Sequence, residues 1–122
     1  MAYFYIATNT HKKERATRPP TVILGVAFDK DSAAAAGVVL AREALAAGAT
    51  EGLITIGELP RYPSALGAKP VSGWRRLSPP VPWRYGPYHT HYTADPATWI
   101  SNYNSGKVPF GVSREGQAHG IK

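Results

Sequence analysis

Two histidines, His89 and His91, have the spacing that would let both imidazoles reach one metal ion. Thr90 separates them, and residues two apart on a strand point to the same side. Asp95 or His119 would supply a third ligand. Tyrosines flank the pair, however, and histidines in such aromatic surroundings more often hydrogen-bond or stack. A metal-dependent enzyme at these histidines is therefore our third hypothesis, and we expect no metal and no other cofactor.

The sequence contains few residues that are suited to other kinds of catalysis. The chain has no cysteine, which excludes disulfides, thiolate nucleophiles and cysteine-ligated zinc. No serine lies in a nucleophile elbow, and Gly25 and Gly37 do not form a phosphate-binding glycine motif. Asp29, Asp31 and Glu58 fall near the ends of expected elements, where capping explains them better than acid–base catalysis. We expect a protein that is not an enzyme.

Aromatic and basic residues alternate in Trp74-Arg75-Arg76 and in Trp83-Arg84-Tyr85. This composition is typical of single-strand nucleic-acid binding and also of protein interfaces. Because prolines separate the two motifs, they suit an extended arm that lies on a neighbouring protein better than a regular sheet. The expected interface residues are Trp74, Arg75, Arg76, Trp83, Arg84, Tyr85, Trp99, Tyr103 and Val39.

A second basic cluster lies in the polar segment 9–20, which ends in two prolines and is expected to be a loop. Its cations could contact phosphates. The alternative hypothesis is therefore a small nucleic-acid-binding protein or an inhibitor of a nucleic-acid enzyme. Its expected contact residues are Lys12, Lys13, Arg15, Arg18, Arg75, Arg76 and Arg84.

The charge is unevenly distributed between the two halves of the chain. The net charge is +6, yet residues 1–59 contain as many acidic as basic side chains. Residues 60–122 carry eight Lys and Arg against two Asp and Glu. A basic second half indicates an anionic partner, either nucleic acid or an acidic protein surface.

The first half predicts three strands and one helix. Branched and aromatic residues favour strands at 3–8, 21–28 and 53–59. Residues 32–47 are rich in alanine and predict a helix, with Asp31 as its N-cap and Gly48 at its end. The order allows an antiparallel or mixed layer, which we favour. Alternatively, the second and third strands pair in parallel across the helix.

The second half has a different composition. It contains nine of the eleven prolines, all three tryptophans and five of the seven tyrosines. Proline at this density argues against long helices and central strands. We expect a mostly irregular arm with one short helix, which Asp95 caps and Pro96 begins, and which presents Trp99, Ile100 and Tyr103 on one face. A hairpin turning at 104–107 is the alternative, and 108–112 is a candidate edge strand.

Together these patterns predict an α+β chain: a ββαβ-type domain over residues 1–59, then a basic arm over 60–122 that belongs to the same unit or packs on a neighbour. The first hypothesis is a structural subunit of a larger particle, for example a phage or virus virion component of decoration or connector type. Its partners would be other protein subunits, as a homo- or hetero-oligomer. No signal peptide or membrane span is recognisable, so we expect the cytoplasm or a virion.

Overall fold

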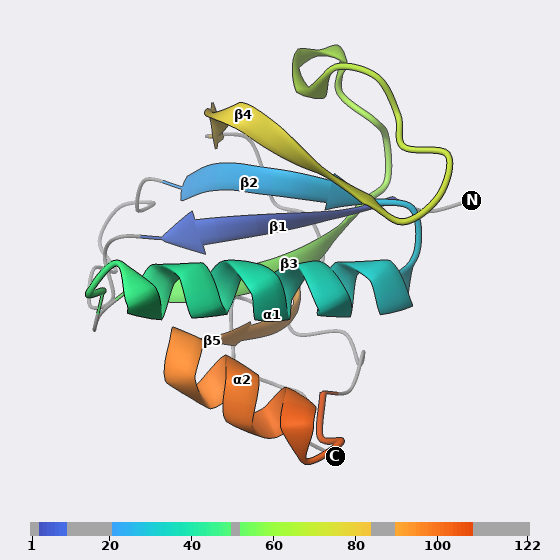
Figure 1. Cartoon of the computed structure of the whole chain (residues 1–122). Helices are drawn as coiled ribbons and strands as arrows, with labels where there is room; N and C mark the ends of the chain where they lie inside the picture. The colour runs from blue at the N-terminus through green and yellow to red at the C-terminus, as the bar shows by residue number, and fades with distance from the viewer. Residues whose placement is uncertain (1–2, 10–20, 50–51, 84–89, 109–122) are drawn as a thin grey trace.

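A computed structural model describes residues 3–9, 21–49, 52–83 and 90–108, and the account below concerns these residues. They form a five-stranded antiparallel sheet in the order β4-β2-β1-β3-β5, with helices α1 and α2 (Figure 1). The strands are β1 (Tyr3–Asn9), β2 (Thr21–Ala27), β3 (Leu53–Leu59), β4 (Trp74–Trp83) and β5 (Thr90–Ala94). The helices are α1 (Lys30–Ala46) and α2 (Pro96–Asn104), with a short 3-10 turn η1 (Ser64–Leu66). The predicted α+β class is confirmed.

The first half follows the predicted strand, strand, helix, strand order. β1 lies at the centre of the sheet and pairs antiparallel with β2 on one side and β3 on the other. β2 and β3 therefore run in the same direction, but they do not pair with each other. The favoured antiparallel layer is thus correct, and the parallel βαβ alternative is wrong.

The second half is more regular than expected, and the prediction of a mostly irregular arm is corrected here. β4 pairs with β2 and β5 pairs with β3, so the two strands extend opposite edges of the same sheet. Pro79, Pro80 and Pro82 lie within β4. Proline is tolerated there because an edge strand needs backbone partners on one side only.

Both helices have carboxylate caps, one of which differs from the prediction. The N-cap of α1 is Asp29, whose Oδ1 accepts a hydrogen bond from the Ser32 amide at 2.7 Å. Asp31 instead lies in the first turn. The capping side chain must belong to an extended residue that precedes the helix, and Asp29 has that conformation (φ −147°). Gly48 ends the helix with φ +90°, as expected.

The short second helix is confirmed, and it starts where the sequence predicts. Asp95 caps α2 by accepting from the Thr98 amide at 2.8 Å, and Pro96 occupies its first position. The helix continues through Asn104, so the alternative of a hairpin turn at 104–107 is wrong. Of the candidate edge strand at 108–112, only Val108 belongs to the described residues.

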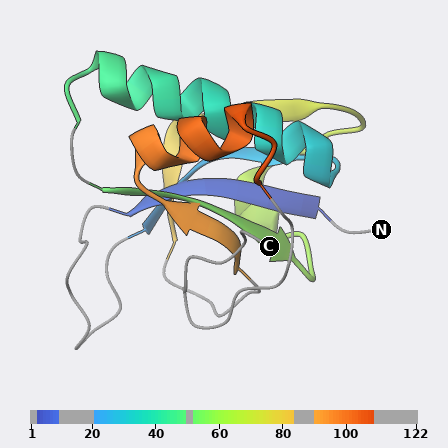
Figure 2. The same ribbon diagram turned by 90° about the horizontal axis from the view of Figure 1, so that it is seen from below.

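The two helices lie side by side on one face of the sheet (Figure 2). Trp99 of α2 is fully buried between them, with its ring against Gly37 of α1. A Cβ at Gly37 would lie 2.7 Å from Cζ2 of that ring, so the absence of a side chain makes room for the indole. A small residue in α1 thus admits the ring of the second helix. The apolar core of this face includes Phe4, Ile6, Leu40, Ile54, Ile56, Tyr92 and Trp99.

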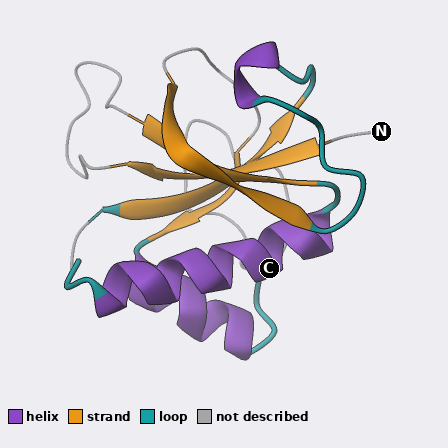
Figure 3. Ribbon diagram, turned by 45° about the horizontal axis from the view of Figure 1, so that its top comes forward, coloured by secondary structure: helices purple, strands orange, loops and turns teal. Residues whose placement is uncertain are grey.

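A second apolar cluster lies on the opposite face of the sheet, and it includes Leu66 from the segment that joins β3 to β4. Figure 3 shows this segment and its short helical turn on the side of the sheet away from α1 and α2. The ring of Tyr5 lies over Gly57, its partner on β3. A Cβ added at Gly57 would lie 2.4 Å from the phenol ring. The cluster contains Tyr5, Ala7, Ile23, Val26, Leu59, Leu66, Leu77 and Trp83. In the described part of the chain, no helix has the length and apolar character needed to cross a membrane.

Candidate functional site

The three tryptophans of the predicted interface differ in their environments. Trp99 is fully buried and Trp83 is 7% exposed, so both rings belong to the core of their own chain. Within the described residues, these two rings pack against their own chain. Trp74 alone of the three is half-buried, at the start of β4. It packs against Gly25, where an added Cβ would lie only 3.1 Å from the indole ring.

The neighbouring arginines lie on opposite faces of β4, because successive strand residues alternate. Arg75 faces the second cluster, where its Nη2 donates to the carbonyl oxygens of Leu66, at 2.6 Å, and Ala68, and to the Tyr62 hydroxyl at 3.3 Å. These contacts anchor the segment between β3 and β4. Arg75 Nη2 is therefore engaged within the chain.

Arg76 points toward α1 and pairs with Glu43. Its Nη1 and Nη2 donate to the two carboxylate oxygens of Glu43 at 2.9 Å and 2.7 Å, a bidentate arrangement that fixes both side chains. The same guanidinium lies 5.6 Å from the centre of the Trp74 ring, within cation–π range. The hydrogen bonds from Arg76 lower the pKa of the Glu43 carboxyl, and those to Glu43 raise the pKa of Arg76.

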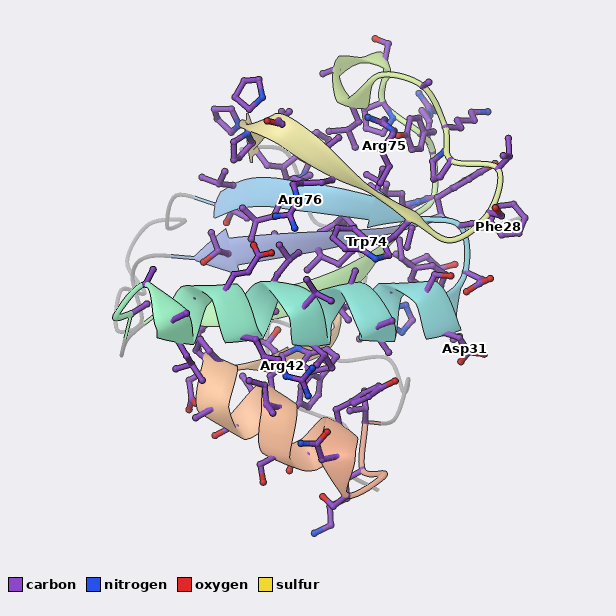
Figure 4. All side chains as sticks on the ribbon, viewed as in Figure 1. Phe28, Asp31, Arg42, Trp74, Arg75 and Arg76 are labelled. Atoms are coloured by element: carbon purple, nitrogen blue, oxygen red, sulfur yellow. The ribbon has the colours of Figure 1, made fainter. Side chains whose placement is uncertain are left out.

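Two further residues of α1 extend this surface. Val39 is 37% exposed, and it precedes Arg42 by three residues and Glu43 by four, so it lies beside both on the helix. Figure 4 shows Trp74 and Arg76 on one side of α1 and Arg42 on the other. We call the set of Val39, Arg42, Glu43, Trp74 and Arg76 the α1–β4 surface.

The remaining predicted interface residues do not join the α1–β4 surface. Tyr103 lies on α2, 38% exposed, with its ring centre 6.0 Å from that of Trp99. Arg84 and Tyr85 lie outside the described residues, as do Lys12, Lys13, Arg15 and Arg18 of the nucleic-acid hypothesis. Glu43 and Arg42 were not predicted at all. No local signal links Glu43 to an arginine 33 residues away.

His91 is buried at the edge of the sheet. It is 3% exposed, its Nε2 lies 3.3 Å from Oε1 of Glu58, and its ring contacts Phe4. A shift of register between β3 and β5 leaves His91 as the extra residue of a bulge. His89 and His119 lie outside the described residues, and Asp95 is engaged as the cap of α2. Within the described ranges, no three His, Cys, Asp or Glu side chains come together as a metal site.

A cluster of aromatic rings at one end of the sheet was also missed. Tyr3 makes edge-to-face contacts with Phe28 and Tyr62, at centroid distances of 6.0 and 5.4 Å. Lys69 Nζ lies 5.9 Å from the centre of the Tyr3 ring. Burial raises the pKa of Tyr62, and the hydrogen bond from Arg75 opposes that rise. These residues come from separate segments, so their proximity has no sequence signature.

Comparisons with protein-family models, with curated proteins and with solved structures found no match to this chain.

Proposed function

We propose that the chain is a non-enzymatic subunit of a larger protein assembly and that it contacts its neighbour through the α1–β4 surface. The observation that carries this proposal is the half-buried Trp74 ring with Arg76 held over it by Glu43. Tryptophan and arginine are the residues most enriched at the energetic centres of protein interfaces.

The rigidity of the α1–β4 surface supports the same proposal. Its side chains come from one helix and one strand, and the bidentate ion pair restricts Arg76 and Glu43 before any partner arrives. Ordering a free arginine side chain on binding costs about 1 kcal/mol. A guanidinium that is already fixed avoids much of that cost, so this surface favours association.

This proposal differs from the sequence-based one in the residues that make the contact. An extended arm was expected to supply them, but Trp83 and Trp99 now lie in the core of the chain. The contact we propose uses the folded body of the protein, with Val39 and Trp74 as its apolar centre and charged side chains around them. The neighbour is another protein subunit.

Site-specific photocrosslinking tests this proposal. A benzoylphenylalanine at position 39 would sample the α1–β4 surface, and one at position 65, exposed on η1, serves as the matched control. In the cells that make the protein, we expect position 39 to crosslink to a discrete protein species and position 65 to give none. Crosslinks to nucleic acid at position 39, or the same products at both positions, would refute the proposal.

Nucleic-acid binding remains the second candidate because of the aromatic cluster of Tyr3, Phe28 and Tyr62 beside Lys69. Aromatic rings of this kind can stack on bases, and a lysine beside them can contact phosphates. This candidate predicts that an oligothymidine binds with an affinity that falls steeply with salt. It also predicts that Phe28→Ala and Lys69→Gln weaken binding whereas Arg42→Gln does not. Absence of binding at low salt would exclude it.

A further inference from the structure

We infer that the partner of the α1–β4 surface is an acidic protein segment, which places an apolar side chain against Val39 and Trp74 and a carboxylate on Arg42. This inference rests on the proposed function, because it names the chemistry of the neighbour that the assembly requires. Three observations carry it: the continuity of the surface, its uncompensated charge and the charge of the whole chain.

The α1–β4 surface is continuous from one end to the other. Arg42 and Glu43 each lie one turn from Val39 on the exposed side of α1. Glu43 is bound to Arg76, and Arg76 lies over Trp74. A single extended segment that crosses α1 toward β4 would therefore meet a guanidinium, an apolar side chain, an ion pair and an indole in turn. Figure 4 shows the first and last of these groups, Arg42 and Trp74, on opposite sides of α1.

The free positive charge on this surface is at Arg42. Arg42 is exposed and has no hydrogen-bond or ion-pair partner among the described residues. The charges of Arg76 and Glu43 cancel within their pair. A carboxylate of the partner is the complement of the remaining guanidinium, and Arg42 can bind it through two parallel hydrogen bonds.

A second copy of this chain is a poor occupant. Each copy carries a net charge of +6, so two copies repel at long range. A two-fold contact would also have to satisfy Arg42 with a carboxylate from the same surface, and its glutamate is already paired.

Nucleic acid is also a poor occupant of this surface. A phosphate backbone is bound by several cations that follow its path. Here one free guanidinium lies beside a carboxylate and a valine, and the second guanidinium is neutralised. The apolar and charged groups match a protein segment in which carboxylates and apolar side chains alternate.

The probe for a direct test is a fluorescent peptide of alternating glutamate and leucine, followed by fluorescence anisotropy with the full chain. The controls are a peptide of alternating lysine and leucine and an oligothymidine. Arg42→Gln removes the free guanidinium, and Arg61→Gln removes an exposed arginine elsewhere on the molecule. Both replaced side chains are exposed, and a thermal unfolding curve for each variant shows that it is folded.

We expect the acidic peptide to bind and the basic peptide not to bind. Arg42→Gln should weaken binding by about fivefold, the upper end for an exposed charge pair, and Arg61→Gln should leave it unchanged. Equal binding of both peptides, equal loss in the two arginine variants, or tighter binding of oligothymidine would overturn the inference.

Failure of this inference is distinguishable from failure of the proposed function. If position 39 crosslinks to a protein but the acidic peptide does not bind, the assembly role stands and the chemistry of the neighbour is wrong. If position 39 crosslinks to no protein, both are wrong. Self-association that Arg42→Gln abolishes would assign the surface to a second copy and would likewise overturn the acidic partner.

Discussion

At the scale of single residues, a glycine decides how the two helices pack. Gly37 lies in the middle of α1, where alanine would ordinarily favour the helix by about 1 kcal/mol. The Trp99 ring occupies the place where a Cβ would be, and it is fully enclosed, so it cannot move aside freely. Packing therefore outweighs helix propensity at this position.

Gly37→Ala should destabilise the protein by up to about 2 kcal/mol, because an overpacking cost of about 1–3 kcal/mol is offset only in part by a gain in helix propensity of about 1 kcal/mol. Chemical unfolding of the purified variant measures the change. The double variant with Trp99→Phe is the control, since phenylalanine lacks the ring atoms that meet position 37. There, Gly37→Ala should cost less. A stabilising effect in the otherwise native chain would show that the contact is looser than described.

The ion pair of Glu43 and Arg76 predicts a pH dependence at the same scale. Arg76 lowers the pKa of Glu43 in the folded chain, so the unfolded chain takes up the proton first as the pH falls. The pair therefore stabilises the fold above the ordinary glutamate pKa of about 4.3 and loses this effect as the pH drops through the lowered value.

Glu43→Gln should accordingly reduce stability by less than about 1 kcal/mol at neutral pH, as exposed pairs do, and by nothing at strongly acidic pH. Urea unfolding of both proteins across the acid range gives the difference. A difference that persists unchanged at low pH would mean that it does not arise from the carboxylate charge.

At the scale of elements, the adjacent arginines Arg75 and Arg76 of β4 have different structural roles. Arg75 anchors the segment between β3 and β4 through backbone carbonyls of that segment, whereas Arg76 ties the exposed side of α1 to the edge strand. Charge-assisted hydrogen bonds in a half-buried site are worth more than an exposed pair.

Arg75→Gln should therefore cost about 2 kcal/mol of stability, and Arg76→Gln less than about 1 kcal/mol. The two changes remove the same charge from neighbouring positions, so each is the control for the other. Amide exchange should accelerate at Leu66 and Gly67 in the first variant only, since these amides close η1. Equal costs would contradict the anchoring role.

The elements that sequence could predict are those specified by local signals. Branched and aromatic residues predict the bounds of β1, β2 and β3 to within one residue, and a carboxylate cap followed by proline predicts the start of α2. β4 was missed because proline density argues against strands in general, whereas an edge position permits it. The α1–β4 surface was half-predicted: Trp74, Arg76 and Val39 were named for their type, but Glu43 depends on a contact between distant segments.

At the scale of the whole molecule, the second half completes the core of the first. Trp99 and Tyr92 cover the apolar faces of α1, β1 and β3, and β4 adds Leu77 and Trp83 to the opposite cluster. Without them, residues 1–59 would expose Ile54, Ile56 and Ile23, which are now buried. A chain that short has little other surface to bury.

A fragment of residues 1–59 should therefore not fold, and its circular dichroism should change without a cooperative transition on heating. The full chain, measured at the same concentration, should unfold cooperatively. Sharp and dispersed amide resonances from the fragment would show that the first half is an independent domain after all.

The prolines of β4 also affect whether another strand can pair with the free edge of the sheet. Pro79, Pro80 and Pro82 carry no amide hydrogen, so along much of its length β4 has fewer donors for a foreign strand. Growth of the sheet into fibres by edge-to-edge addition is thereby discouraged at this end. The contact that we propose at the α1–β4 surface uses side chains, so it would form and break without a backbone ladder.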